Sequence, residues 1–214
     1  MIAMIRTCII RFSLEMPYQH LSNKTCSLCL YYFNAVKPFH YKLLQRAIMI
    51  YSNTNPAYKI ISNHGFAEVV ENTALQQHSL HAVTAYNAGD IICSFAAKET
   101  LTQPTYLTIQ INHDHHITLA PEFLQYINHS CHPNVFFDTT NFQLLAVLAI
   151  EPGDELTFFY PSTEWVMAQP FICFCNTTKC LHSIQGAAQL DEKVLQQYQL
   201  TNFIKTKISQ RQQH

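Results

Sequence analysis

Three short segments hold most of the side chains that could do chemistry. Residues 128–134 read Asn-His-Ser-Cys-His-Pro-Asn, a density of polar and ligating groups that does not suit a strand interior. Residues 153–160 read Gly-Asp-Glu-Leu-Thr-Phe-Phe-Tyr, which predicts a turn and then a strand ending at Tyr160. Residues 173–180 hold three of the eight cysteines as Cys-x-Cys-x4-Cys. Taken alone, the first segment could equally be an asparagine-closed turn, and Tyr160 could be a core residue.

The cysteine spacing favours a metal site over disulfides. Cys173, Cys175 and Cys180 leave a tetrahedral zinc ion one ligand short. Cys131 is the candidate fourth ligand, because its neighbours already mark an unusual loop. The start of the chain shows no clear export signal, and disulfides are rare in reducing compartments. The alternative is a set of buried free thiols, since unpaired cysteine is commonly buried.

Two further groups of potential ligands are weaker candidates. Cys26-x-x-Cys29 would need two more ligands for a second zinc site, and His20 and His40 are loosely spaced for that role. A core or surface thiol pair is the alternative. Residues 113–116 read His-Asp-His-His and could bind a transition metal. Adjacent strand residues point to opposite faces, however, so a polar hairpin turn is favoured there.

The elements that must position these residues are mostly short strands. Runs rich in β-branched and aromatic residues predict strands at Phe66–Val70, Leu80–Ala85, Ile91–Phe95, Thr105–Gln110, Asn134–Phe137, Phe142–Ala149 and Leu156–Tyr160. Little helix lies between them, so we expect a mostly β, antiparallel fold. Apolar spacing predicts helices at Tyr41–Ile50 and Ala188–Gln199, and the polar stretch Thr201–His214 is expected to be a frayed tail.

Composition narrows the function classes. The 214 residues are 48% hydrophobic and 13% charged with a net charge of -1, which suits one domain with a sizeable core. A near-neutral chain lacks the basic stripe of a dedicated nucleic-acid binder. The best apolar run, Leu144–Ile150, is far shorter than the ~20 residues of a bilayer span. Arg6 and Arg11 interrupt the apolar start, so it is a poor secretory signal. The cysteine thiolates favour a reducing cytoplasm or nucleus, and we expect no direct nucleic-acid or membrane partner.

Together and in this order, the three segments resemble the SET-domain protein-lysine methyltransferases, as NHSCxPN, GDELTFxY and a post-SET CxCx4C motif. The resemblance implies a mostly β SET fold, with β-clip-like small sheets, a knot-like crossing, short helices and a post-SET zinc segment. The expected domains are an N-terminal extension (1–60), the SET domain (61–168), the post-SET zinc segment (169–187) and a C-terminal helix and tail (188–214).

The resemblance also implies a role for each matching residue. Tyr160 would be the catalytic tyrosine, and Tyr106 and Phe158 would line the channel for the substrate lysine. The binding of S-adenosylmethionine is implied for Asn128, His129, Ser79 and Leu80, and a structural zinc ion for Cys131, Cys173, Cys175 and Cys180. The expected function is methyl transfer to the ε-amine of a lysine in a protein substrate. The substrate, the number of methyl groups and the oligomeric state are left open by the sequence.

The sequence departs from the family pattern at two places. Gln77 and Ser79 stand where the family usually has the two glycines of a GxG motif. Asn176 and His182 stand where post-SET segments often have glycine, and asparagine tolerates a positive φ. The first departure motivates an alternative from a different class, a catalytically silent, zinc-stabilised, SET-like module that binds a peptide.

Overall fold

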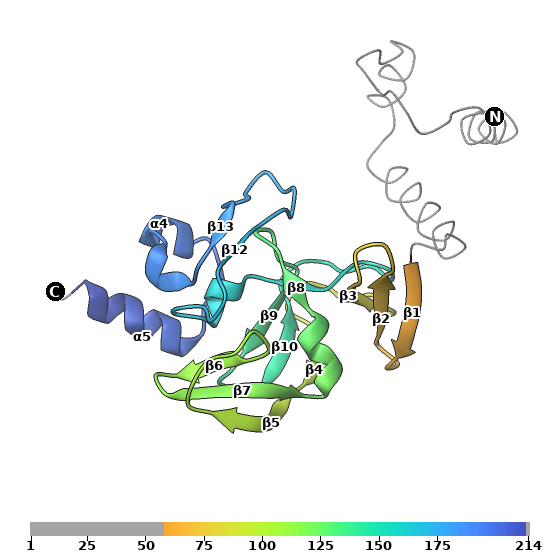
Figure 1. Cartoon of the computed structure of the whole chain (residues 1–214), viewed down its shortest axis with the longest axis horizontal. Helices are drawn as coiled ribbons and strands as arrows, with labels where there is room; N and C mark the ends of the chain where they lie inside the picture. Colours follow the sequence, from red (N-terminus) through yellow and green to blue (C-terminus); the bar gives the residue numbers. More distant parts are fainter. Residues whose placement is uncertain (1–57, 213–214) are drawn as a thin grey trace, which may run out of the picture. The chain divides into compact units, whose positions relative to one another are not determined.

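The computed structural model describes residues 58–212, and Figure 1 shows these residues as several small sheets with short helices. The predicted helix Tyr41–Ile50, the Cys26 and Cys29 pair and nearly all of the predicted N-terminal extension lie outside the described residues. No helix among the described residues is long and apolar enough to cross a bilayer.

Three of the sheets are three-stranded and antiparallel. Strands β1 (Tyr58–Asn63), β2 (Ala67–Asn72) and β3 (Gln77–Ala82) form the first in chain order. The second has the order β4 (Ile91–Ser94), β10 (Gln143–Ala146) and β9 (Val135–Asp138). The third has the order β5 (Ala96–Leu101), β7 (His115–Ala120) and β6 (Ile109–Asn112), and the 3₁₀ helix η1 (Glu122–Tyr126) follows β7.

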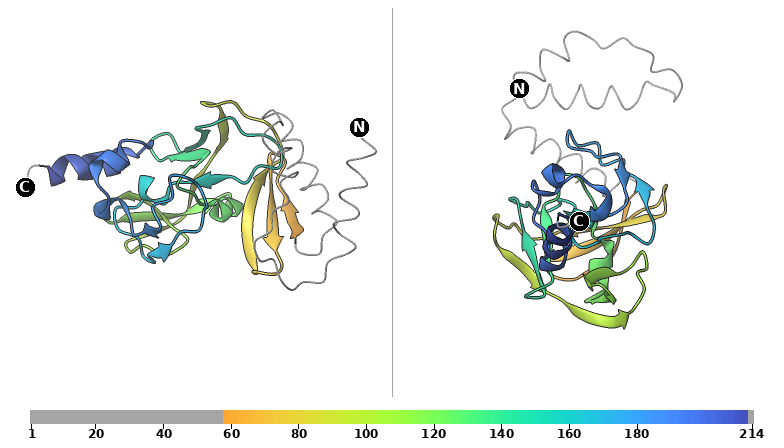
Figure 2. Two further views of the ribbon diagram at one scale, coloured as in Figure 1. Left: turned by 90° about the horizontal axis from the view of Figure 1, so that it is seen from above. Right: turned by 90° about the vertical axis from the view of Figure 1, so that its left-hand side faces the viewer.

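Two short strand pairs complete the sheets and bring distant segments together. β8 (Asn128–His129) pairs in parallel with β11 (Thr157–Phe158), although about 30 residues separate them. β12 (Phe171–Ile172) pairs with β13 (Ser183–Ile184) in antiparallel fashion. The parallel pair lies between the β1–β3 sheet and the C-terminal helices in Figure 1 and in the left view of Figure 2.

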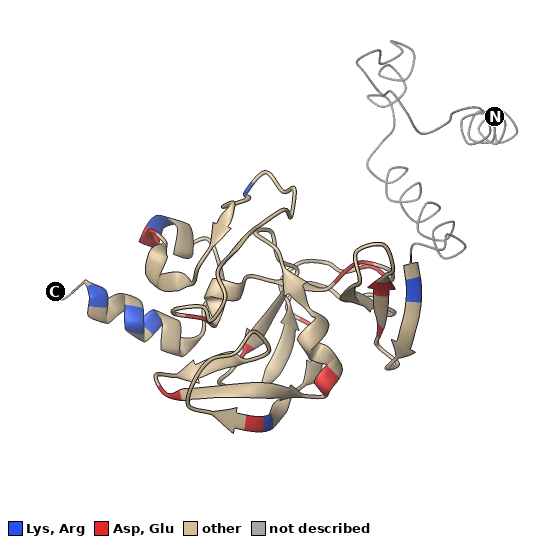
Figure 3. Ribbon diagram, viewed as in Figure 1, with Lys and Arg blue, Asp and Glu red and all other residues tan. Residues whose placement is uncertain are grey.

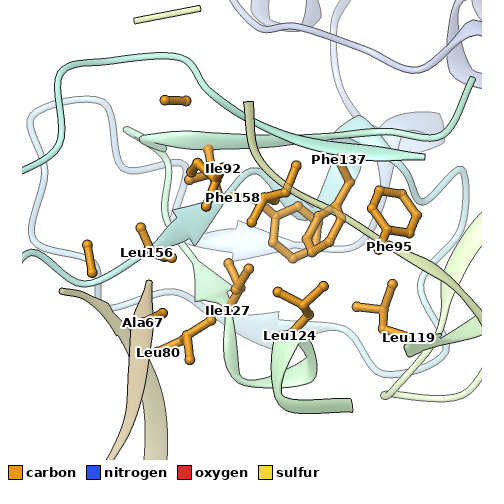
Figure 4. Packing of buried hydrophobic residues seen from close by; sticks show 14 of the residues in the cluster. Ala67, Leu80, Ile92, Phe95, Leu119, Leu124, Ile127, Phe137, Leu156 and Phe158 are labelled. Carbon is orange, nitrogen blue, oxygen red and sulfur yellow. The ribbon is translucent and has the colours of Figure 1, made fainter. Parts of the chain in front are cut away.

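One main core supports the β8–β11 pair. Its buried side chains come from all three larger sheets, from η1 and from the strand that precedes Tyr160. Figure 4 shows Phe158, Phe137 and Phe95 side by side above Leu124 and Ile127. Phe137 meets Phe95 and Phe158 edge to face, with ring centroids 5.3 and 4.9 Å apart. Such aromatic pairs add to the stabilisation from buried area alone. The core therefore fixes one side of the segment that carries Tyr160.

The C-terminal region is more ordered than the sequence predicted. The expected helix at Ala188–Gln199 is a 3₁₀ turn, η3 (Ala187–Gln189), followed by the four-residue α4 (Glu192–Leu195). The expected frayed tail is wrong, because α5 spans Asn202–Arg211. Thr201 caps it by accepting a hydrogen bond from the Ile204 backbone N–H, and the Ile204 side chain is fully buried. A side-chain cap and one buried apolar contact outweigh a polar composition.

The seven predicted strands each overlap an observed strand, but the sequence missed others. β1 and β5 were missed because they are largely exposed and show little apolar alternation. The strand predicted at Thr105–Gln110 begins only at Ile109, and residues 105–107 lie in a turn. The polar hairpin turn predicted at residues 113–116 is confined to the first two residues, because His115 already starts β7.

Candidate active site and zinc centre

The parallel pair β8–β11 holds the first two motifs side by side. His129 lies opposite Phe158 in the register of the pair, and the Ser130 N–H donates to the Phe158 carbonyl over 3.0 Å. Two residues after Phe158 the chain reaches Tyr160, which opens the 3₁₀ helix η2 (Tyr160–Ser162). Segments that the sequence separates by about 30 residues therefore meet at one point.

Asn128 connects this point to the β1–β3 sheet. Its Nδ2 donates to the His78 carbonyl and to Oε1 of Glu155, both over 3.0 Å. One amide therefore joins β8 to β3 and to Glu155, which lies just before β11. The negative charge of Glu155 also reaches Tyr160, where it contributes to a raised phenol pKa. The site thus contains a carboxylate beside an amide and a phenol, a combination that suits a positively charged ligand.

His129 links the tyrosine to the cysteines. Its Nδ1 accepts a hydrogen bond from the Tyr160 backbone N–H over 3.3 Å, so its Nε2 carries the proton. That Nε2 lies 3.3 Å from Sγ of Cys131 and donates to it. Burial lowers the pKa of His129 to about 4, so the ring is neutral at physiological pH. A neutral imidazole with one defined proton is a positioning group here.

Tyr160 stands in an aromatic enclosure. Its ring centroid lies 4.6 Å from that of Phe158, 5.2 Å from that of His129 and 5.9 Å from that of Phe171. Burial, and then the charge of Glu155, raise the pKa of Tyr160 to about 12. The phenol therefore keeps its proton at neutral pH, and its chemistry is that of a hydrogen-bonding group and not of a general base.

The four predicted zinc ligands lie together. The sulfur atoms of Cys131, Cys173, Cys175 and Cys180 are all within 4.8 Å of one another, and those of Cys131 and Cys173 are 3.9 Å apart. Zinc–sulfur bonds of ~2.3 Å in a tetrahedron place sulfurs about 3.8 Å apart, so the cluster fits a zinc ion. Backbone N–H groups support it, since Leu181 donates to the Cys131 sulfur over 3.3 Å. Cys93, on β4, is not part of this cluster.

The backbone of the cysteine segment requires two unusual conformations. Asn176 and His182 have φ values of 54° and 61°, in the left-handed region that glycine adopts without cost. These are the two positions at which the sequence departs from the glycines of post-SET segments. The departure is therefore one of residue type only, because the backbone turns in the manner that glycine would allow.

The residues predicted to bind the methyl donor from β3, or to line the lysine channel, do not all lie beside Tyr160. Leu80 is 0% exposed and fills the core, and its carbonyl accepts a hydrogen bond from the Leu156 N–H over 2.7 Å. Ser79 directs its hydroxyl to Nε2 of His81 over 2.9 Å. Tyr106 is 73% exposed and lies in the turn before β6, so its placement in a strand was wrong. The ring of Phe158 lies between that of Phe137 in the core and that of Tyr160. The roles of Ser79 and Leu80 in donor binding, and of Tyr106 and Phe158 in the lysine channel, stay predictions.

The sequence offered no signal for two residues of the site. Phe171, on β12, packs edge to face against His129 as well as Tyr160, with ring centroids 5.5 Å apart for the first pair. Glu164 is 7% exposed and accepts hydrogen bonds from the Gln110 N–H over 2.8 Å and from the Thr163 hydroxyl over 3.1 Å. Burial raises the pKa of Glu164 to about 7. The long sequence separations explain why no local pattern revealed these contacts.

Comparison with known proteins agrees with this geometry. Residues 9–161 match the SET domain family, and the chain therefore belongs to that family. It is 33% identical over 159 residues to the methyltransferase flvH of Aspergillus flavus, covering 73% of this chain and 89% of the relative. It is also 32% identical over 77 residues to a histone-lysine N-methyltransferase, H3 lysine-36 specific, of Candida albicans, covering 33% of this chain and 9% of that protein.

These matches confirm the predicted SET fold and support methyl transfer as the chemistry of the chain. The family match begins at residue 9, inside the segment that the sequence predicted as an N-terminal extension. The domain boundaries drawn from the sequence therefore stay a prediction. The four-cysteine cluster is compatible with the expected zinc ion.

Proposed function

We propose that the chain transfers a methyl group from S-adenosylmethionine to the ε-amine of a lysine in a protein, with a structural zinc ion held by Cys131, Cys173, Cys175 and Cys180. The observation that carries the proposal is the chain of contacts from the cysteine cluster through His129 to Tyr160. These contacts place the Tyr160 phenol in an aromatic enclosure beside the parallel strand pair.

The enclosure suits a lysine amine that must lose its proton before it reacts. Lysine has a pKa of ~10.4 in water, so only ~0.1% or less is neutral at pH 7. Phe158, Tyr160 and Phe171 provide apolar ring surface that disfavours the charged ammonium. S-adenosylmethionine supplies an electrophilic methyl group on a sulfonium when it is bound. Asn128 and His129 would hold it, and alignment of the groups could contribute ~7–11 kcal/mol.

The distribution of charge supports a cationic substrate. Residues 58–164 contain eleven acidic residues and only two basic ones, although the whole chain is close to neutral. The basic residues of the described region gather mainly on the C-terminal side. Lys205, Lys207 and Arg211 lie on α5, where Figure 3 shows basic residues in blue. A negative field over the sheets favours approach of a lysine-bearing segment. The acidic character of the catalytic region was hidden by the net charge of the whole sequence.

Tyr160→Phe tests the proposal. The variant keeps the ring and its packing but loses the hydroxyl, so methyl transfer should fall by at least tenfold while the fold is retained. The assay is incorporation of label from methyl-labelled S-adenosylmethionine into lysate proteins, with mass spectrometry to locate the modified lysines. Tyr86→Phe is the control, because the Tyr86 hydroxyl makes only an exposed 3.5 Å contact with Thr84. A Tyr160→Phe protein as active as the parent would contradict the assigned role.

The alternative is a catalytically silent module that uses the same site to hold a peptide. Its motivation is the pair Gln77 and Ser79, whose side chains replace the glycines that let a backbone approach the donor closely. The Ser79 hydroxyl is already bonded to His81, so this side chain has a fixed place on β3. Titration calorimetry separates the two functions, since no binding at millimolar S-adenosylmethionine would favour the silent module.

A further inference from the structure

The C-terminal segment that follows the cysteines packs against the residue next to Tyr160. Phe159, Ala187, Leu195, Leu200 and Ile204 form a second buried cluster, separate from the main core. Phe159 directly precedes Tyr160, so this cluster holds the residue next to the tyrosine, whereas Phe158 belongs to the main core. The C-terminal helices therefore pack against the residue next to the proposed catalytic group, although neither lies within residues 9–161 that match the family.

Tyr198 makes two specific contacts from this segment. Its ring stacks on Phe159 with the centroids 3.7 Å apart and the planes inclined by 8°. Its hydroxyl donates to the backbone carbonyl of Cys131 over 3.0 Å, across 67 residues of sequence. The side chain is half-buried, so both contacts lie partly out of water, where hydrogen bonds and stacking contribute most.

The two contacts close a ring of interactions around the site. Cys131 receives a hydrogen bond from His129, and His129 receives one from the Tyr160 N–H. Tyr160 follows Phe159, on which Tyr198 stacks, and Tyr198 returns to the carbonyl of Cys131. One side chain therefore fixes both the cysteine that anchors the first motif and the residue that sets the position of Tyr160.

We propose that Tyr198 is a positioning residue for methyl transfer: it holds the Cys131 carbonyl and the Phe159 ring so that Tyr160 and the cysteine cluster keep their relative placement. The inference rests on the proposed function, because it assigns a role within the same site. Tyr198 touches neither reacting group and acts through Cys131 and Phe159.

The test compares Tyr198→Phe, which loses only the hydroxyl, with Tyr198→Leu, which also loses the stack. Tyr86→Phe is the matched control, because it removes a tyrosine hydroxyl outside the ring of contacts. The three measurements are the rate of zinc release to a chromogenic chelator, the initial rate of methyl transfer at saturating donor, and hydrogen exchange of peptides covering residues 128–133 and 157–163.

Tyr198→Phe should release zinc roughly tenfold faster than the parent and transfer methyl groups roughly tenfold more slowly, because one partly buried hydrogen bond is lost. Its dissociation constant for S-adenosylmethionine should stay within about twofold, which separates positioning from general loss of folding. Faster exchange should be confined to the two peptides, and Tyr198→Leu should exaggerate every effect.

Parent-like zinc release, transfer rate and exchange in Tyr198→Phe would overturn the inference. A uniform rise in exchange over the whole chain would also overturn it, since that marks a purely structural role. A parent chain that methylates nothing overturns the proposed function instead, and the exchange of the two peptides then still decides whether Tyr198 fixes their placement.

Discussion

Replacing Glu164 by glutamine should make the chain more stable at high pH and not at low pH. The carboxyl group of Glu164 is buried and accepts two hydrogen bonds, from Gln110 and Thr163. Glutamine has nearly the same shape as the protonated acid, and its amide oxygen can accept the same two bonds. The substitution therefore removes only the ability to ionise in a buried place.

The magnitude follows from the raised pKa of Glu164, about 7 against an ordinary 4.5. The folded chain binds more protons here than the unfolded chain between these values, so the free energy of unfolding falls as pH rises through them. The full cost of ionisation is about 3 kcal/mol above pH 7. Between pH 5.5 and pH 8.5 the stability difference between Glu164→Gln and the parent should grow by about 2 kcal/mol.

Urea denaturation of both proteins at several pH values between 5.5 and 8.5 measures this difference directly. Zinc loss at low pH affects both chains alike and cancels in the comparison. Glu122→Gln is the control, because Glu122 is exposed and forms a surface ion pair with Lys98. A stability difference between Glu164→Gln and the parent that does not change with pH would refute the reasoning that burial disfavours the ionised form of Glu164.

Two further substitutions test the metal cluster and a close backbone contact. Cys173→Ser should abolish stoichiometric zinc and lower the melting temperature by several degrees, because structural zinc contributes to folding, whereas Cys93→Ser should leave zinc at one equivalent as judged by atomic absorption. Gly186→Ala should cost roughly 2–4 kcal/mol of unfolding free energy, because a Cβ there would lie 2.6 Å from the Trp165 carbonyl oxygen at a φ of 120°. Gly65→Ala also has a positive φ but meets nothing within 4 Å, so denaturant melts should show a smaller loss for it; equal losses would contradict the steric account.

Local sequence patterns determined the class of the chain and which residue types its candidate site contains. The order and spacing of the three motifs predicted a SET-domain methyltransferase, and the family match confirms that prediction. Most core strands were also predictable, because β-branched and aromatic runs that bury one face leave a local pattern. β7 was missed, although its Ile117 and Leu119 are buried. The Cys-x-Cys-x4-Cys motif supplies three of the four ligands of a tetrahedral zinc site, and Cys131 lies close to these three cysteines, as expected.

The tertiary structure alone decided what crosses long stretches of sequence. The approach of Tyr198 to Cys131 and of Phe171 to His129 depends on how the chain passes over the β8–β11 pair, and no local pattern encodes that path. The raised pKa of Glu164 has the same origin, because a carboxyl group titrates according to the surroundings that folding places around it. Residue types set the available chemistry, and burial together with long-range contacts decided which of those residues act together.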